Sequence, residues 1–328
     1  MSQFYNWKTV ENSLFCVLQL YFLTNSNQKY LIAVGGATAS GKTGLAIRLA
    51  QHFQTEILSA DSRQFYREMS IGTAKPAPAE LAQAPHHFID SLSIFDPYTV
   101  GDFERDALAK LHRLFEKHQV VILAGGSGLF IRAILEGLDD FPEVPEEIKQ
   151  QLQQAYEEQG LPFLQRELQE KDPVYYEEVD LENPMRVLRA LGVIRASGQA
   201  FSSFRQGQTK ERFFESICVL LDWDRDLLYQ RINQRVDLMI EEGLLEEARR
   251  LFPHRHLNAL QTVGYQELFD HFEGHHDLNT AIELIKRNSR RYAKRQGTWF
   301  RKRPIWQGFP PQDWDALLAF ILQCMEEI

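Results

Sequence analysis

The order of hydrophobic and polar residues along the chain predicts a sheet of short, buried strands. Apolar runs of strand-like composition recur, and helical patterns lie between several of them. The predicted strands cover residues 30–34, 56–59, 87–90, 120–124 and 216–221. This alternation predicts an α/β fold in which helices cover both faces of a mostly parallel sheet. Ligands of such sheets bind beyond the carboxyl ends of the strands, so the residues after each run are the candidates for chemistry.

Between about residues 142 and 205 the pattern changes to helices rich in glutamine, glutamate and arginine. Ile148, Leu152 and Tyr156 are spaced by four and would share one helical face. We interpret this segment as an inserted all-helical lobe. The other expected segments are an α/β core over residues 30–141 and 206–310, a long helix over about 226–251 within it, and a C-terminal helix over 311–328.

Composition and charge narrow the class of protein. Of the 328 residues 44% are hydrophobic, which is enough for a full core. Cys16, Cys218 and Cys324 lie far apart, without the spacing of a disulfide framework or a zinc site, which favours a cytoplasmic protein. The formal net charge of -9 argues against a protein that coats nucleic acid uniformly, although the charges are unevenly placed.

The beginning of the chain is harder to interpret. No apolar run reaches the roughly 18 residues that a membrane-spanning helix needs, so we expect no contact with a membrane. Residues 13–23 are apolar like the middle of a signal peptide, but Glu11 precedes them and no small-residue cleavage pattern follows. We therefore interpret residues 1–29 as an extension of unclear role, either an appended strand or a translated upstream segment.

The segment GATASGKT matches the G-x-x-x-x-G-K-[ST] phosphate loop, and it lies between a predicted strand and a predicted helix, as that motif requires. Gly36 and Gly41 let backbone amides turn toward phosphate oxygens at the start of a helix. Lys42 supplies a full charge, and the Thr43 hydroxyl is placed for a magnesium ion. We expect a P-loop NTPase-like core with a diphosphate held by Gly36, Ala37, Thr38, Ala39, Ser40, Gly41, Lys42 and Thr43.

Polar side chains also follow three other predicted strands. Asp61 would hold magnesium through water or accept a proton from a nucleophile, and a helix N-cap is the third interpretation. Ser127, in a second glycine turn, would point into the same crevice, although serine in such a turn is often only a turn former. Arg225 would be a second cation for the phosphates, or else an ordinary surface arginine at a helix start.

A basic segment covers residues 286–303, where nine of eighteen residues are Lys or Arg and none is acidic. Tyr292, Trp299 and Phe300 are interleaved with these cations. Cations that neutralise phosphates, together with rings on which unpaired bases stack, are what a single-stranded RNA loop requires. We therefore predict that this segment contacts nucleic acid.

With these residues in view, the chain resembles the tRNA dimethylallyltransferases, which modify the adenine beside the anticodon. The resemblance runs from about Lys29 to Arg303 and rests on the order and spacing of its motifs. These are GATASGKT, DSRQFY, IGTAKP, PHHFID, GGSGLF, NPMRVLRAL, VGYQE and AKRQGTWFR. The resemblance implies that the phosphate loop holds the diphosphate of dimethylallyl diphosphate, and that no nucleoside triphosphate is spent.

The resemblance also implies a role for individual residues. Asp61 would be the general base, and Ser127 would help to position the base and the diphosphate. Lys42, Thr43 and Arg225 would hold the diphosphate with Mg²⁺. The partner would be the anticodon stem-loop of tRNA, and we expect a monomer. The implied tRNA contacts are Asp61, Ser62, Arg63, Gln64, Ser127, Lys149, Met185, Arg186, Arg189, Gln261, Gly264, Tyr265, Lys294, Arg295, Gln296, Trp299 and Arg301.

The chain departs from the family pattern at four positions. Members usually have proline at the position of Ala37 and threonine at that of Ser127, and these two changes keep the loop glycines and the hydroxyl. Members usually have tyrosine at the position of Phe130 and glutamate at that of Gly192. The chain therefore lacks a phenol and a carboxylate that the family pattern contains.

These residues would activate both partners of an alkyl transfer. The exocyclic amine of adenine is a poor nucleophile, because its lone pair is delocalised into the ring. Lys42, Arg225, the loop amides and magnesium would stabilise the leaving diphosphate. Asp61 would accept the amine proton, and a stacked adenine would have to be flipped out to reach this acid.

Three alternatives would use the same phosphate loop. A phosphoryl-transferring kinase would bind ATP there, but the basic aromatic segment would remain unexplained. A GTPase-like RNA-binding switch would need an N-K-x-D stretch, which the sequence lacks. A prenyltransferase that acts on free adenine nucleotides would share the front half of the chain.

Overall fold

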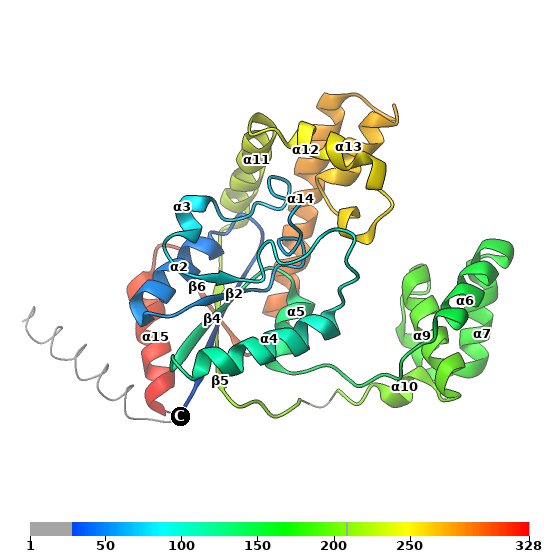
Figure 1. Ribbon diagram of the computed structural model, residues 1–328, viewed down its shortest axis with the longest axis horizontal. Helices are drawn as coiled ribbons and strands as arrows, with labels where there is room; N and C mark the ends of the chain where they lie inside the picture. Colours follow the sequence, from blue (N-terminus) through cyan, green and yellow to red (C-terminus); the bar gives the residue numbers. More distant parts are fainter. Residues whose placement is uncertain (1–27, 208, 328) are drawn as a thin grey trace, which may run out of the picture. The chain divides into compact units, whose positions relative to one another are not determined.

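The computed structural model describes residues 28–207 and 209–327, which form two compact units. Unit 2 spans Glu136–Glu211, and the other described residues form unit 1 (Figure 1). Most of the predicted N-terminal extension, with Cys16, lies outside the described residues. No helix in the described part of the chain is long and apolar enough to cross a membrane.

Unit 1 is built on an all-parallel sheet with the strand order β3-β2-β4-β1-β5-β6. The α/β class predicted from the sequence is therefore confirmed. The strands are β1 Tyr30–Gly36, β2 Ile57–Ser59, β3 His86–His87, β4 Val120–Ala124, β5 Glu215–Leu221 and β6 Trp306–Phe309.

Two details of the predicted sheet differ from the structure. The strand predicted over residues 87–90 exists but spans only His86–His87, because Phe88 and Asp90 have φ angles of 62° and 52°, which an extended strand cannot contain. The edge strand Trp306–Phe309 was not predicted, since it follows directly on the basic segment.

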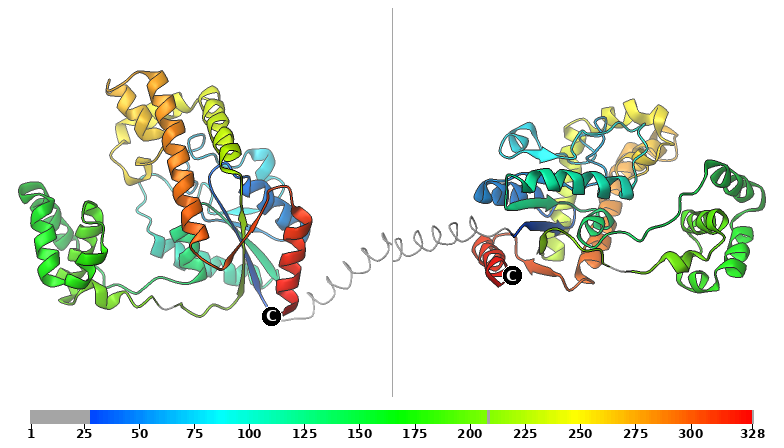
Figure 2. Two further views of the ribbon diagram at one scale, coloured as in Figure 1. Left: turned by 180° about the vertical axis from the view of Figure 1, so that it is seen from behind. Right: turned by 60° about the horizontal axis from the view of Figure 1, so that its bottom comes forward.

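Helices cover both faces of the sheet, as the views from two sides show (Figure 2). Along β1, Leu31 and Ala33 point into the core that includes α4, α5 and the end of α14, whereas Ile32 and Val34 point into the core with α2 and α15. This alternation is the period of two that a strand buried on both faces produces. The helices are α2 Lys42–Phe53, α4 Val100–Phe115, α5 Gly128–Leu135, α14 Leu278–Arg301 and α15 Trp314–Glu327.

A further helical cluster lies after β5 and packs around its own core, which includes Tyr265, Leu268 and Met69. The single long helix predicted over 226–251 was wrong, because Gly243 breaks it with a left-handed φ of 102°. The remaining elements of unit 1 are α3 Pro78–Leu81, α11 Arg225–Glu241, α12 Leu244–Leu251, the 3₁₀ turns η1 Phe252–His254 and η2 Asn258–Leu260, and α13 Tyr265–Phe272.

The described residues of unit 2 form helices and no strands. Leu152 is buried in its core, and Ile148 and Tyr156 pack against the same cluster, as their spacing predicts. A side chain at Gly192 would meet Val144 at 3.2 Å, so this buried position has little room for the glutamate of the family pattern. The helices are α6 Glu146–Gln159, α7 Leu161–Lys171, α8 Pro173–Glu178, α9 Pro184–Ser197 and α10 Phe201–Phe204.

Candidate active site

The phosphate loop joins β1 to α2 at the carboxyl edge of the sheet. Ala39 and Gly41 adopt left-handed φ angles of 63° and 90°, which turn the chain tightly before α2 begins. No side chain in the described structure caps the first turn of α2, so its amide hydrogens are free for an anion. The Ser40 hydroxyl is buried and, among the described residues, has no hydrogen-bond partner. The loop has the backbone geometry of an anion site.

Lys42 lies over this loop. Its Nζ donates a hydrogen bond to Ala37 O at 2.7 Å. Burial lowers the pKa of Lys42 to about 8; the charge of Asp61 opposes this shift, and the charge of Arg235 adds to it. The ammonium group is therefore desolvated and would gain from a bound anion.

Two arginines from α11 contact the loop, and the sequence analysis missed both of them. Arg231 Nε donates to Ala39 O at 2.9 Å, and an Arg235 guanidinium nitrogen lies 3.5 Å from Thr38 Oγ1. Burial, followed by the charge of Arg231, lowers the pKa of Arg235. Their spacing of four residues on one helix face is the sequence signal that could have revealed them.

Arg225 occupies a different place from the one predicted. It is the first residue of α11, and its side chain is 77% exposed beside Asp226 at 3.5 Å. The described residues include no hydrogen bond or ion pair between Arg225 and the phosphate loop. Arg231 lies more than one helical turn beyond the helix start, so the residues that reach the loop lie further along α11.

Asp61 and Ser127 lie at neighbouring strand ends, as parallel strands require. Asp61 Oδ1 accepts a hydrogen bond from Arg63 N at 3.0 Å in a tight turn, and no helix begins there, so the N-cap interpretation fails. Ser127 Oγ accepts from Ser62 N and donates to Ser62 Oγ, both at 3.1 Å. The charge of Asp61 raises the pKa of Lys42, so the acid lies within electrostatic reach of the phosphate loop.

Tyr292 of α14 completes this group; the sequence had indicated it only as one of the rings on which bases could stack. Burial raises its pKa to about 12; the charge of Asp61 acts in the same direction, and a hydrogen bond with Ser127 opposes it. The ring remains 37% exposed. A neutral phenol therefore lies beside both the acid and the serine.

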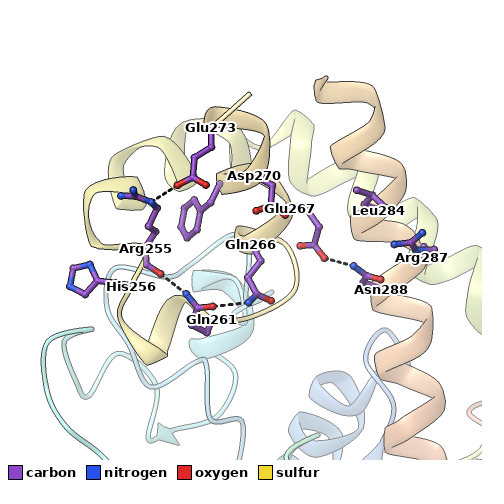
Figure 3. A pocket seen from close by; sticks show the side chains of 11 residues that line it. Arg255, His256, Gln261, Gln266, Glu267, Asp270, Glu273, Leu284, Arg287 and Asn288 are labelled. Atoms are coloured by element: carbon purple, nitrogen blue, oxygen red, sulfur yellow. Dashed lines mark hydrogen bonds and ion pairs between the residues drawn. The ribbon is translucent and has the colours of Figure 1, made fainter. Parts of the chain in front are cut away.

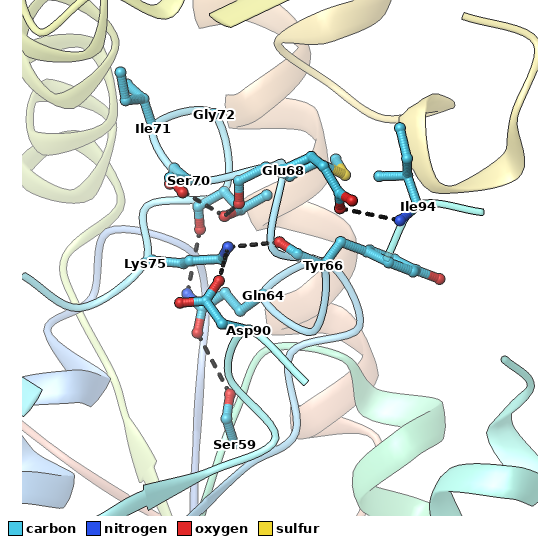
Figure 4. Close-up of polar contacts among 12 residues, drawn as sticks. Ser59, Gln64, Tyr66, Glu68, Ser70, Ile71, Gly72, Lys75, Asp90 and Ile94 are labelled. Atoms are coloured by element: carbon cyan, nitrogen blue, oxygen red, sulfur yellow. Dashed lines mark hydrogen bonds and ion pairs between the residues drawn. The ribbon is translucent and has the colours of Figure 1, made fainter. Parts of the chain in front are cut away.

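The side chains of Arg63 and Gln64 donate hydrogen bonds to backbone carbonyl groups. Arg63 donates to Asn258 O at 2.9 Å and to Ala259 O at 3.0 Å. Gln64 donates to Thr73 O at 3.2 Å and to Ala74 O at 3.1 Å, in the network that Figure 4 shows. These two predicted tRNA contacts therefore hold neighbouring loops in place.

Glu247 of α12 also holds one of these loops in place through hydrogen bonds. It is 2% exposed, and its carboxylate accepts from the amides of Ser70, Ile71 and Gly72 at 2.9 to 3.0 Å. Tyr265 is fully buried and donates its hydroxyl to the same carboxylate at 2.7 Å. Tyr265 therefore stabilises a turn and does not lie at the surface, where the prediction of a tRNA contact would require it.

A polar pocket of about 510 Å³ lies between α13 and the first half of α14 (Figure 3). Gln261 and Gln266 line it and are joined by a hydrogen bond of 2.7 Å. Gly264, between them, has a φ of 101° and donates its amide to Glu267 at 2.8 Å. The predicted contact segment from Gln261 onward thus forms one wall of an open, polar pocket.

The basic segment divides into two faces of α14. Phe300 is fully buried against Trp306, and Trp299 packs on the same core, so these aromatic rings serve the fold; the expectation that they stack on bases was wrong for Phe300. Gln296 is also buried. The exposed residues of α14 include Arg287, Arg291, Tyr292, Lys294, Arg295 and Arg301.

In unit 2 the predicted tRNA contacts lie on helix surfaces. Lys149 pairs with Glu146 at 3.2 Å on α6. On α9, Met185 is 73% exposed, Arg186 is exposed, and the Arg189 guanidinium lies 5.2 Å from the centre of the Phe141 ring. An exposed methionine beside two arginines is consistent with a binding surface.

The donor groups near the loop fit magnesium, because the Thr43 hydroxyl and the Asp61 carboxylate are the hard oxygen ligands that this ion prefers. A separate group of possible metal ligands, Asp270, Glu273 and His275, is exposed at the end of α13 and just beyond it. It does not include any residue of the phosphate loop.

Comparisons with known proteins agree with this geometry. The model of the IPP transferase family matches residues 64–303. The chain is 57% identical over 275 residues to a tRNA dimethylallyltransferase of Christiangramia forsetii, covering 84% of this chain and 91% of that protein. It is 52% identical over 280 residues to one of Flavobacterium johnsoniae, with the same coverage.

Two solved structures are also similar to this chain. The tRNA isopentenylpyrophosphate transferase of Bacillus halodurans is similar to this chain with a TM-score of 0.66 and 34% identity, over 92% of this chain and 96% of that one. A eukaryotic dimethylallyltransferase that acts on tRNA shares the fold, with a TM-score of 0.75 at 24% identity, over 87% of this chain and 75% of that one.

Proposed function

Because this chain belongs to the IPP transferase family, its activity is that of a tRNA dimethylallyltransferase, and we propose that its residues divide the reaction into a donor half and an acceptor half. The donor is dimethylallyl diphosphate, and the acceptor is the exocyclic amine of the adenine beside the anticodon. One observation supports this most strongly: a phosphate loop and the carboxylate of Asp61 lie within electrostatic reach of each other.

The donor half is the phosphate loop with its cations. The uncapped amides at the start of α2 and the partly buried ammonium of Lys42 would bind the diphosphate oxygens. As the allylic carbon–oxygen bond breaks, negative charge grows on the leaving diphosphate. Arg231 and Arg235 reach the loop, so we propose that they stabilise this charge and that Arg225 contributes less.

Magnesium would bind beside the donor. The Thr43 hydroxyl would hold it against the diphosphate, and Asp61 would reach it only through water, which leaves the carboxylate free to accept a proton. When bound, the ion neutralises charge on the leaving group.

The acceptor half is the group around Asp61. We propose that Asp61 accepts the proton of the adenine amine as nitrogen bonds to the allylic carbon, while Ser127 and Ser62 fix the adenine and the turn. The proton leaves the nitrogen, and the electron pair of the broken carbon–oxygen bond leaves with the diphosphate. The adenine must be flipped out of the anticodon loop to reach the carboxylate.

The exposed cations of α14, with the arginines of α9 in unit 2, would bind the tRNA backbone. Arg291, Lys294 and Arg295 have exposed side chains, as counterions for phosphates require. Gln261 and the pocket that it lines would contact unpaired nucleotides of the anticodon loop.

Incubation with dimethylallyl diphosphate tests this proposal, with bulk tRNA, AMP or no acceptor in parallel. Mass spectrometry of the digested nucleosides should show one added prenyl unit on adenosine from the tRNA arm. Prenylation of AMP alone would make the protein an adenine-nucleotide prenyltransferase. In a further arm that contains ATP, transfer of its terminal phosphate without use of the prenyl donor would make the protein a kinase.

A further inference from the structure

The side chain of Gln296 joins the two glycine turns of unit 1. Its oxygen accepts a hydrogen bond from Thr38 N at 2.8 Å, and its nitrogen donates one to Gly126 O at 2.9 Å. Thr38 belongs to the phosphate loop, and Gly126 precedes Ser127 in the second turn. One amide therefore contacts the donor half and the acceptor half at once.

This bridge is buried. Gln296 is 7% exposed, which leaves it little contact with solvent. Its two partners are backbone groups with opposite hydrogen-bonding character, and a primary amide satisfies both of them. Loss of the amide would leave a buried donor and a buried acceptor unpaired, which strongly favours the bridged arrangement.

The second turn is fitted closely against α14. A β-carbon placed at Gly126 would lie 2.4 Å from Gln296 Nε2, and one placed at Gly128 would lie 2.5 Å from the Trp299 ring. Only glycine allows the backbone to approach so closely. One turn earlier on α14, Tyr292 lies beside Ser127. The helix therefore holds the acceptor turn at several consecutive points.

We propose that Gln296 is a positioning residue that sets the separation between the diphosphate on the phosphate loop and the adenine held at Ser127. This inference rests on the proposed function. Transfer requires the amine nitrogen to approach the allylic carbon to within contact distance, so a small shift between the two turns slows the reaction sharply. The resemblance instead implies that Gln296 contacts tRNA, and the two roles predict different measurements.

Gln296→Met keeps the length of the side chain and removes both hydrogen bonds. We expect the single-turnover transfer rate, with both substrates saturating, to fall at least about tenfold. We expect the Kd for tRNA to stay within about twofold, because Gln296 is buried. A raised Kd with an unchanged rate at saturation would mean that Gln296 is an RNA contact, and would overturn the inference.

Gly126→Ala provides a second variant that leaves α14 itself unaltered. The added methyl group would displace the Gln296 amide, so the transfer rate should fall as in Gln296→Met. The control is Gln165→Met in unit 2, whose amide also donates to a backbone carbonyl, that of Leu181, at 3.0 Å. Its transfer rate should match that of the wild type.

A double-mutant cycle separates positioning from folding. If Gln296 acts through the Ser127 turn, Gln296→Met should slow a Ser127→Ala protein much less than it slows the wild type. If Gln296→Met slowed transfer by the same factor in the Ser127→Ala protein as in the wild type, the inference would be overturned. A lower melting temperature with a normal transfer rate would overturn it as well. A wild type and control that transfer no prenyl group would instead refute the proposed function.

Discussion

The two faces of α14 have different surroundings, although their residues alternate in one short motif. The inner face carries Gln296 and Phe300, which are buried against the glycine turns and the core. The outer face carries Arg291, Lys294 and Arg295, which are exposed. The comparison shows that neighbouring residues of one helix differ sharply in burial, and we propose that they control separate quantities: the inner face and its partners the rate of transfer, and the outer face the affinity for RNA.

The largest effect is expected on the inner side, at the acid. Asp61→Asn should lower the single-turnover rate about 10³-fold, because it removes the group that accepts the amine proton. The Kd for tRNA should remain nearly unchanged, since Asp61 is one small side chain among many contacts. Rapid-quench assays beside a binding titration measure both quantities, and an unaffected rate would remove Asp61 from the role of base.

The outer face should show the opposite behaviour. Replacement of Arg291, Lys294 and Arg295 together by Gln should weaken tRNA binding roughly 100-fold at low salt. The slope of log Kd against log salt should become less steep by about 2 to 3, because the variant neutralises fewer phosphates and its binding therefore releases fewer counterions. An unchanged slope would mean that this face does not touch phosphate. Lys286, which pairs with Asp237 at 2.8 Å, provides a cation on the same helix for a control variant.

The cations of the donor half can be ranked by how much each contributes to the affinity for dimethylallyl diphosphate. Arg235→Ala should raise the Kd for dimethylallyl diphosphate by roughly 10- to 30-fold, because a charge-assisted contact with phosphate is lost. Arg225→Ala should change it less than about twofold, since that side chain is largely exposed beside Asp226. Calorimetric titration of both variants measures this, and the reverse order would restore Arg225 as the principal phosphate cation.

The smallest expected effect is a pH dependence of donor binding. Lys42 has a lowered pKa of about 8, so its ammonium form predominates below that pH and is lost above it. Affinity of the free protein for diphosphate should therefore be nearly constant below pH 7 and fall about tenfold between pH 7 and pH 9. Lys42→Met should bind weakly at every pH without this decline. A decline of equal size in that variant would assign the titration to another group.

Local sequence patterns predicted much of the fold. Four of the six strands and the phosphate loop follow from patterns within a few residues, because burial on both faces and glycine turns leave local signatures. The break at Gly243 was missed, since a single glycine inside a helical pattern does not show its φ angle.

The site was predicted less completely than the fold. Arg231 and Arg235 reach the loop only because of the rotation of α11 about its axis, which the tertiary structure fixes. The burial of Tyr265 and Gln296 likewise depends on partners distant in sequence, Glu247 and Gly126. A motif shared with a family therefore marks segments of the chain but does not separate their buried residues from their exposed ones.

The most direct measurement is the single-turnover rate as a function of tRNA concentration, for Asp61→Asn, the outer-face triple variant and the two combined. We predict that the combined protein has the reduced maximal rate of Asp61→Asn and the raised half-saturating concentration of the triple variant, each unaltered by the other. A triple variant whose maximal rate falls as far as that of Asp61→Asn would contradict the separation of rate and affinity between the two faces.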